Sequence, residues 1–270
     1  MVYEFRGSAR HFVVPGILYF ALGSSAFAVD CGDTITSPEV LDQDLVCSTE
    51  PALTIMGPTG SLDMAEYTLR CDGSAVGIQI DGVAAFLSNG VVTLCDIGIS
   101  LDGTGAHNIQ AIRVDGTDIS GIAVNSSFNS VIQSGIFKNS GTGIFIAGDN
   151  NNVSSSSILD NLENGIQLEG NNNLIVSNEI SRSTLNGILI GKADGNTVAQ
   201  NTVSMSGIGG ANTAGILLEL LGQSGNVIVG NTVFSNIDFD LQDNNSSPCL
   251  NSWVGNSPDA TTSGDCVTSN

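Results

Sequence analysis

The sequence predicts an all-β fold: a single-stranded, right-handed parallel β-helix (a solenoid) with coils of about 22 residues and disulfide-stapled ends. Three observations predict it: a repeated four-residue phrase, a column of asparagines in phase with it, and alternation of apolar residues inside each unit. The phrase Gly-Ile-x-apolar begins at Gly121, Gly143, Gly165 and Gly187, at steps of 22 residues. It returns at Gly215 after a step of 28, and a variant without glycine closes the series at 238–241.

Asparagines recur in phase with the glycine phrase, each just before a short apolar run. They are Asn129, Asn151, Asn173, Asn196 and Asn226, followed five residues later by Ser134, Ser156, Asn178, Asn201 and Asn231. Identical amides on successive coils can hydrogen-bond to one another, so the first column is predicted to form a structural ladder. An insertion at 205–213, rich in Gly, Ser and Asn, lengthens one unit without loss of register, as repeat architectures allow.

Each unit is too small to fold alone. Its apolar residues alternate with period two, which indicates strands with one buried face. Stacked on its neighbour at about 4.8 Å, each unit merges its apolar column into a shared core. The turns are rich in Asn and Gly, which tolerate the left-handed conformation of sharp corners. Left-handed solenoids repeat in multiples of six residues, and the sequence shows no such period, so the right-handed form is predicted.

The chain divides into four segments. Residues 1–28 are predicted to be a signal peptide, with two arginines, an apolar run from Phe12 to Leu22, and the cleavage site Ala-Phe-Ala at 26–28. A membrane anchor is the alternative, although the run is shorter than the roughly 20 residues a span needs. No later segment is long enough, so the mature chain has no predicted membrane span. An N-terminal cap is expected at 29–60, coils at 61–243, and a C-terminal cap at 244–270.

All six cysteines lie in the mature part. They are Cys31, Cys47, Cys71, Cys95, Cys249 and Cys266. An even number in an exported chain predicts disulfides, for which 15 pairings exist. Proximity along the chain favours pairing each cysteine with its nearest neighbour, which would staple both ends. A metal site is the alternative, but no Cys-x-x-Cys occurs. Trp253, between the last two cysteines, is expected to plug the core.

Charge limits the classes of partner. Without residues 1–28 the chain has five basic and 26 acidic residues, a formal net charge of −21. Nucleic acid and anionic membranes need basic surfaces and are therefore excluded as partners. The apolar fraction is ordinary, which argues against a disordered acidic chain. The expected protein is secreted, periplasmic or attached to the cell surface, and monomeric.

The repeats, together with the opening at 31–36 and the ending Asn-Ser-Trp at 251–253, resemble secreted bacterial right-handed parallel β-helix repeat proteins. These belong to the pectate-lyase-like superfamily, and some relatives are periplasmic accessory proteins of copper enzymes. The resemblance covers nearly all of the mature chain and is specific for fold rather than for activity. Relatives often carry an Asp-Leu-Asn-Gly-His-like stretch near the start, and here residues 63–67 read Asp-Met-Ala-Glu-Tyr.

Lyases of this superfamily use calcium and a basic residue. The best carboxylate pair is Asp81 and Asp102, at equivalent places on adjacent coils, where their oxygens could hold Ca²⁺. The alternative is a turn position that favours Asp. Arg113 is the nearest candidate base, with the alternative that it is an exposed arginine paired with Asp115 or Asp102. A polyanionic substrate would be repelled by the net charge unless calcium or a local basic groove reversed the sign.

Other catalytic patterns of the superfamily are missing, including the aspartate trio of the hydrolases and the Asp-Pro-His-Asp motif of the alginate epimerases. His107, the single histidine of the mature chain, is expected in a solvated turn. Asp238 and Asp240 are expected to face outward rather than to bind a metal. Lys138 and Asp160 occupy equivalent places one coil apart, which predicts a surface ion pair.

Aromatic residues are few, and no sugar-stacking platform is apparent, although Phe145 takes an outward position in the phrase. The leading functional hypothesis is a non-catalytic scaffold or binding module that needs no cofactor. Its candidate partners are polysaccharide or a cell-surface protein. The alternative is a divergent Ca²⁺-dependent polysaccharide lyase or a related carbohydrate-active enzyme.

Overall fold

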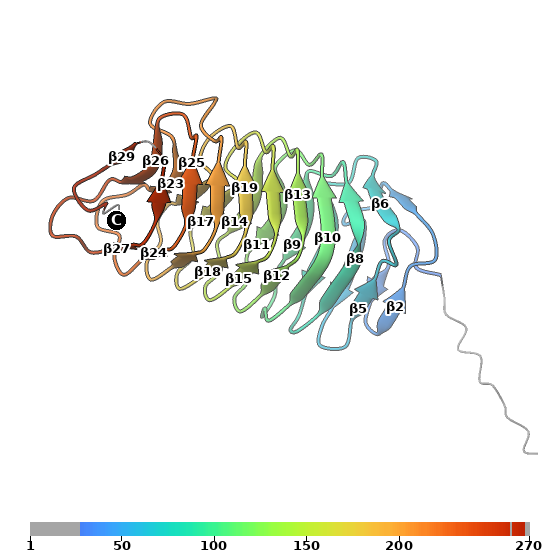
Figure 1. Ribbon diagram of the computed structural model, residues 1–270. Coiled ribbons are helices and arrows are strands. Elements are labelled where there is room, and N and C mark those ends of the chain that lie inside the picture. The colour runs from blue at the N-terminus through green and yellow to red at the C-terminus, as the bar shows by residue number, and fades with distance from the viewer. Residues whose placement is uncertain (1–27, 260, 268–270) are drawn as a thin grey trace, which may run out of the picture.

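The computed structural model describes residues 28–259 and 261–267, so the predicted signal peptide lies almost entirely outside the described residues. Over these ranges the chain winds about one axis as a right-handed parallel β-helix (Figure 1), which confirms the predicted fold class. Every element in them is a strand. Accordingly, this part of the protein contains no helix with the length and apolarity that crossing a membrane requires.

One side of the coil is a sheet of 11 parallel strands, called sheet A here. Its strands are β1 (Thr34–Ile35), β4 (Leu53–Met56), β7 (Val76–Asp81), β9 (Ile97–Leu101), β11 (Ser120–Val124), β14 (Thr142–Ile146), β17 (Ile166–Leu168), β20 (Ile188–Ile190), β23 (Ala214–Leu218), β26 (Phe239–Asp243) and β29 (Thr262–Ser263). The glycine phrase forms the central strands of this sheet. Its register is the one the 22-residue period predicts, with Ile122 opposite Ile144 and Ile144 opposite Ile166.

The second and third sides of the coil are each a stack of parallel strands, and the two sides meet at a corner. The second side holds β2 (Pro38–Val40), β5 (Ser61–Asp63), β12 (Ser130–Ile132), β15 (Asn152–Ser154), β18 (Leu174–Val176), β21 (Thr197–Ala199), β24 (Val227–Val229) and β27 (Ser252–Val254). The third side holds β3 (Leu45–Cys47), β6 (Thr68–Cys71), β13 (Gly135–Phe137), β16 (Ser157–Leu159), β19 (Glu179–Ser181), β22 (Thr202–Ser204), β25 (Thr232–Phe234) and β28 (Ser257–Pro258). Two long strands, β8 (Phe86–Thr93) and β10 (Asn108–Asp115), run through the corner and belong to both sides.

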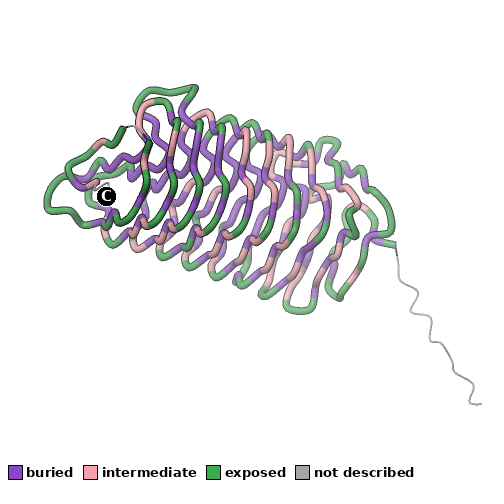
Figure 2. Tube along the Cα trace, viewed as in Figure 1, coloured by how far each residue is buried: buried purple, intermediate pink, exposed green. Residues whose placement is uncertain are grey.

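The inward residues of all three sides form one core that runs the length of the stack. Ile144 from sheet A, Val153 from the second side and Ile158 from the third side are each at most 1% exposed. Buried and more exposed positions alternate along most strands of the second and third sides, whereas β11, β20 and β23 of sheet A are buried at every position (Figure 2). Neighbouring coils are therefore held mainly by the burial of apolar side chains that none of them could bury alone.

Glycine opens the phrase because the next coil passes close to it. A Cβ atom on Gly143 would lie 2.6 Å from the carbonyl oxygen of Gly165 and 2.8 Å from Cγ2 of Ile158. The same 2.6 Å approach recurs between Gly165 and the carbonyl of Gly187. The glycine column is thus a steric requirement of coil stacking.

The asparagine column lies at a corner, directly after a residue with positive φ. The φ angles of Asn150 and Asn172 are 58° and 56°, and the residue that follows each turns inward. The backbone amide of Asn129 donates to Oδ1 of Asn151 at 2.8 Å, and that of Asn151 donates to Oδ1 of Asn173 at 2.7 Å. These side chains satisfy corner amides that would otherwise be buried without partners.

Three disulfides join Cys31 to Cys47, Cys71 to Cys95 and Cys249 to Cys266, the pairings that proximity favoured. The first and last lie near the two ends of the stack. Trp253 is 3% exposed within the core, and its Nε1 donates to Oδ2 of Asp243 at 2.9 Å. Strand pairing extends into both predicted caps, because β1 pairs with β4 and β29 pairs with β26.

Candidate functional site

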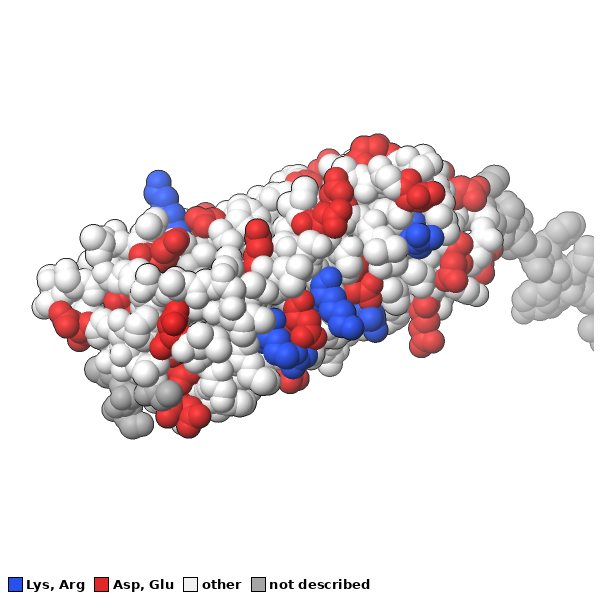
Figure 3. All heavy atoms as spheres, turned by 90° about the horizontal axis from the view of Figure 1, so that it is seen from above, with Lys and Arg blue, Asp and Glu red and all other residues white. Residues whose placement is uncertain are grey.

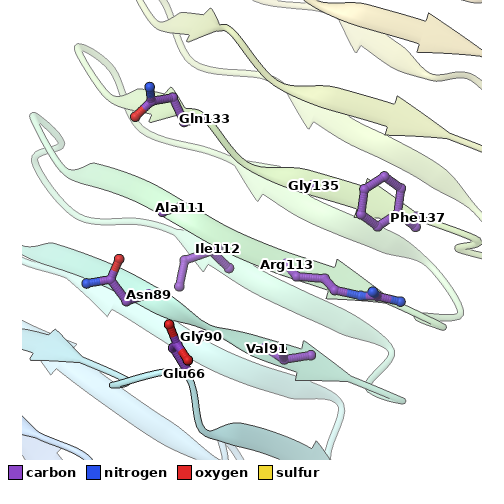
Figure 4. Close-up of a pocket in the computed structure, with 10 residues that line it drawn as sticks. All are labelled: Glu66, Asn89, Gly90, Val91, Ala111, Ile112, Arg113, Gln133, Gly135 and Phe137. Atoms are coloured by element: carbon purple, nitrogen blue, oxygen red, sulfur yellow. The ribbon is translucent and has the colours of Figure 1, made fainter.

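A hollow of about 430 Å³ lies on the outer surface of the third side, over the corner that joins it to the second (Figure 4). Its lining comes from consecutive coils and consists of Glu66, Asn89, Gly90, Val91, Ala111, Ile112, Arg113, Gln133, Gly135 and Phe137. We call this hollow the Arg113–Phe137 groove. Amide side chains line one part of it, whereas a guanidinium and an aromatic ring lie at the other, as Figure 4 shows.

Arg113 is held in place across three adjacent coils. Its Nε lies 2.6 Å from Oδ2 of Asp115, and Oδ1 of Asp115 accepts a hydrogen bond of 2.6 Å from Oγ1 of Thr93 on the preceding coil. Its Cζ lies 5.3 Å from the ring centroid of Phe137 on the following coil, within the range of a cation–π contact. Since Asp115 engages only Nε in this ion pair, the terminal nitrogens of the guanidinium remain available as donors.

Gly135 makes room for the aromatic ring. It lies opposite Arg113 in the strand register, and a Cβ atom on it would lie 2.4 Å from Cε2 of Phe137. The ring therefore folds back along its own strand. Phe137 remains half-buried, and the groove beside it stays open to solvent.

The amide side of the groove follows a corner with positive φ. Asn89, Ala111 and Gln133 have φ angles of 57°, 53° and 52° and stack on successive coils. Asn89 Nδ2 donates to Oδ1 of Asp63 at 3.2 Å, and Gln133 Oε1 accepts from Gln110 Nε2 at 3.3 Å. Each amide keeps hydrogen-bonding capacity toward solvent, which suits a hydroxyl-rich ligand.

The candidate calcium residues lie elsewhere. Asp81 ends a strand of sheet A and its Oδ1 accepts from the amide of Gly82 at 2.6 Å. Asp102 accepts from Oγ of Ser100 at 2.8 Å and from Nδ2 of Asn125 at 2.9 Å. Asp102 and Arg113 are 11 residues apart along the chain, about half a coil, so the structure does not bring the candidate base to these carboxylates. Among the described residues, no three His, Cys, Asp or Glu side chains gather as a metal site would require.

His107 is buried, and the prediction of a solvated turn is wrong. It is 1% exposed and occupies the ladder position one coil before Asn129. Its Nδ1 accepts from the amide of Ala85 at 3.1 Å, and its Nε2 lies 2.9 Å from the carbonyl oxygen of Asp102. These partners assign the proton to Nε2, because Nδ1 faces a donor and Nε2 faces an acceptor. Histidine here replaces the ladder asparagine, as its spacing of 22 residues from Asn129 could have indicated.

We expect His107→Ala to destabilise the fold by about 2–3 kcal/mol, because it leaves the Ala85 amide buried without an acceptor. His107→Asn should recover about half of that loss, since an asparagine oxygen can accept the same hydrogen bond. Urea unfolding followed by circular dichroism measures both variants. Equal losses for the two would show that ring packing, not the ladder bond, is what His107 provides.

Two further predictions about charged residues need correction. Asp240 does not face outward: it is 1% exposed, and its carboxylate accepts from Nδ2 of Asn236 and from the amide of Asp259, both at 2.9 Å. Asp160 pairs with Arg182 on the next coil rather than with Lys138, at 2.5 Å from Nε and 2.9 Å from Nη2. The arginine fork engages both carboxylate oxygens, a geometry that a lysine cannot match.

The Asp160–Arg182 pair predicts a weak pH dependence of stability. The hydrogen bonds from Arg182 lower the pKa of Asp160 from 3.8, so the folded state favours the ionised form. The stabilisation is therefore complete above that unfolded value and is lost as the pH falls through the lower folded value. The two side chains are 35% and 44% exposed, so solvent screening limits the effect to at most about 1 kcal/mol.

The measurement compares Asp160→Asn with the wild type by urea unfolding. The variant should have a slightly lower midpoint at neutral pH, and the difference should disappear as the pH falls below the lowered pKa of Asp160, where the wild-type carboxyl is also neutral. Asp118→Asn, at an exposed aspartate that forms no ion pair within the described residues, is the control. A midpoint difference that persists in acid would contradict the ion-pair explanation.

Solved structures with a similar fold include enzymes that act on polysaccharides. The A-module of the mannuronan C-5 epimerase AlgE4 from Azotobacter vinelandii matches with a TM-score of 0.61 and 13% identity, over 88% of this chain and 77% of that one. The periplasmic alginate epimerase AlgG matches with a TM-score of 0.59 and 14% identity, over 84% and 61%. The enzymatically active domain of tailspike protein 2 from bacteriophage CBA120 matches with a TM-score of 0.56 and 10% identity, over 86% and 41%.

At these identities the likeness establishes the fold alone. None of the curated proteins matches the sequence. A family model described as periplasmic copper-binding protein (NosD) matches residues 76–265, which include most of the coils and the C-terminal disulfide. The family is periplasmic, in agreement with the location predicted for an exported chain. The match spans more than half of the sequence, so this chain belongs to the NosD family of periplasmic β-helix proteins.

Proposed function

We propose that this protein is a non-catalytic periplasmic binding module that holds a segment of polysaccharide in the Arg113–Phe137 groove. The observation that carries the proposal is the pairing of an arginine fixed by Asp115 with an aromatic ring in one open groove. Sugar rings bind to protein through apolar contact with aromatic faces and hydrogen bonds to their hydroxyls. The groove offers both, with the amides of Asn89 and Gln133 as further hydrogen-bonding groups.

The structural neighbours support a carbohydrate ligand. Two of them are named as epimerases of mannuronan or alginate, and they share this fold over more than four fifths of the chain. A parallel β-helix presents long, flat sides on which equivalent side chains repeat at about 4.8 Å. Such a surface suits a polymer whose own units repeat along one direction.

The lining of the groove favours binding over catalysis. Its ionisable side chains are Glu66 and Arg113, with Asp115 behind the arginine in an ion pair. Glycoside hydrolysis typically uses two carboxyl groups, one to give and one to accept a proton, and the lining of the groove includes one carboxyl group, that of Glu66. The alternative of a Ca²⁺-dependent lyase gains no support, because Asp81 and Asp102 lie at the ends of β7 and β9 in sheet A, whereas Arg113 lies on the third side.

Copper binding, which the family description names, does not fit the described residues. Copper is held in proteins by cysteine, methionine and histidine ligands. All six cysteines are in disulfides, and both ring nitrogens of His107 are engaged in hydrogen bonds. The described methionines lie apart, with Met56 in sheet A, Met64 after β5 and Met205 after β22.

The proposal is tested by isothermal titration of oligosaccharides into the mature protein. Phe137→Ala should weaken binding by about tenfold, the effect of losing one aromatic contact of about 1.4 kcal/mol. Phe234→Ala is the matched control, because Phe234 is half-buried in the same row of the third side, several coils away. Thermal melting would show that both variants fold.

Catalysis is checked in parallel, by absorbance for unsaturated uronate products and by NMR for changed sugar configuration. Neither signal is expected. The proposal fails if no polysaccharide binds, if Phe234→Ala weakens binding as much as Phe137→Ala, or if either product accumulates.

A further inference from the structure

Basic side chains are concentrated on the third side. The described residues include five of them, and four lie there: Arg70, Arg113, Lys138 and Arg182. Lys192 lies apart, after sheet A. Figure 3 shows several basic side chains gathered on one part of the surface, with acidic side chains both among them and over the rest of that view. In a chain with a formal net charge of −21 after removal of residues 1–28, this distribution is strongly uneven.

The four cations lie in a band along the axis that is four residue positions wide, because Arg113 lies two positions before the column of Arg70 whereas Lys138 and Arg182 lie one position after it. Arg70 on β6 lies opposite Thr93, which lies opposite Asp115, which lies opposite Phe137. Lys138 directly follows Phe137, and Arg182 directly follows Ser181, which continues the same register through Leu159. We call this band, residues 70, 113, 138 and 182, the basic strip. It passes the guanidinium end of the Arg113–Phe137 groove.

Not all of these charges are neutralised within the protein. Arg182 is engaged by Asp160 through two nitrogens, and Arg113 is engaged by Asp115 through Nε only. Arg70 and Lys138 form no ion pair among the described residues, and both are exposed. Three cations therefore present free donors beside the groove: Arg70, Lys138 and the terminal nitrogens of Arg113.

We propose that the polysaccharide of the groove is acidic and lies along the helix axis, with its carboxylates against Arg70, Arg113 and Lys138. This inference rests on the proposed function and specifies its ligand. From Arg70 on β6 to Lys138 after β13 the three contacts cross three strand spacings of about 4.8 Å, or roughly 14 Å, which fits an oligosaccharide rather than a single sugar. An anionic polymer is repelled elsewhere, so the strip also fixes where it docks.

The test compares two labelled probes of equal length by fluorescence anisotropy: an oligomannuronate and a neutral manno-oligosaccharide. They differ in the carboxylate that replaces the primary alcohol. The acidic probe should bind at least tenfold more tightly, and its affinity should fall as salt is raised, since screening weakens exposed charge pairs. The neutral probe should show little dependence on salt.

Variants locate the effect. Arg70→Gln and Lys138→Gln should each weaken binding of the acidic probe about threefold to tenfold and reduce its salt dependence. Lys192→Gln makes the same change in net charge away from the strip and should leave binding unchanged. An equal loss in Lys192→Gln would show that only net charge matters and would overturn the inference.

The outcomes separate the two proposals. If the neutral probe binds as tightly as the acidic one and Phe137→Ala weakens both, the acidic assignment fails while the proposed function stands. If neither probe binds, both fail. If single-stranded DNA of equal charge binds as tightly as the oligomannuronate, the strip is a general polyanion surface and the carbohydrate assignment fails.

Discussion

Replacing Gly165 with alanine is expected to destabilise the β-helix by about 2–3 kcal/mol, the cost of forcing extra volume into a packed interior. The new Cβ would lie 2.5 Å from Cγ2 of Ile180 in the core and 2.6 Å from the carbonyl oxygen of Gly187 on the next coil. A backbone carbonyl cannot move aside without disturbing the ladder of hydrogen bonds between coils. The same 2.6 Å approach to a backbone carbonyl recurs at Gly121, Gly143 and Gly187, so the effect should not be peculiar to one coil.

Because each coil contacts only its neighbours, the clash should also reduce the cooperativity of unfolding. Urea unfolding followed by circular dichroism should show a lower midpoint and a shallower or divided transition. Gly230→Ser is the matched control: Gly230 has a φ of 64°, and equivalent corner positions carry Ser177 and Gln200 at 57° and 56°. If Gly165→Ala has the same urea midpoint and the same steepness of unfolding as Gly230→Ser, close approach of the coils does not explain why glycine begins each phrase.

The second large effect concerns Asn201, in the column five residues after the predicted ladder. Its Oδ1 accepts from the backbone amide of Asn178 at 2.9 Å, and its Nδ2 donates to the carbonyl of Ile175 at 2.9 Å. Asn201 is 1% exposed, so water cannot replace these partners. Asn201→Leu should therefore cost about 2–5 kcal/mol, from two buried groups left without hydrogen bonds.

Asn201→Ser is expected to cost much less, because Ser134 and Ser156 occupy the same column and accept from the preceding coil through Oγ. The comparison separates loss of the acceptor from loss of side-chain volume. Equal urea midpoints for the leucine and serine variants would show that hydrogen bonding in this column does not govern stability.

The 22-residue period also indicates which residues line the Arg113–Phe137 groove. Arg113 and Gly135 are 22 residues apart, as are Asp115 and Phe137, so each pair lies side by side on neighbouring coils. The groove could have been found by asking which polar and aromatic residues share a column. Phe145, the aromatic residue with an outward position in the phrase, lies half-buried on sheet A.

Ion pairing could not be read from the period alone. The corner column at Lys138, Asp160 and Arg182 places a cation on each side of one aspartate. Asp160 pairs with Arg182 rather than with Lys138 because the guanidinium can reach both carboxylate oxygens at once. This geometry depends on side-chain conformation and not on sequence position. In the same way, Asp240 turns inward because the amide of Asn236 needs a buried acceptor at the end of its column.

The sequence by itself determined the coil length and the inward isoleucines, because a repeat forces equivalent residues into equivalent environments. It favoured three disulfide pairings by proximity but left 15 open, and the structure decided among them. The sequence did not determine that His107 would enter the ladder, that Phe137 would fold over Gly135, or that the few cations would share one side. Those features depend on where each corner directs a side chain and on what the neighbouring coils present to it. Only the stacked structure brings together residues that are a full coil apart along the chain.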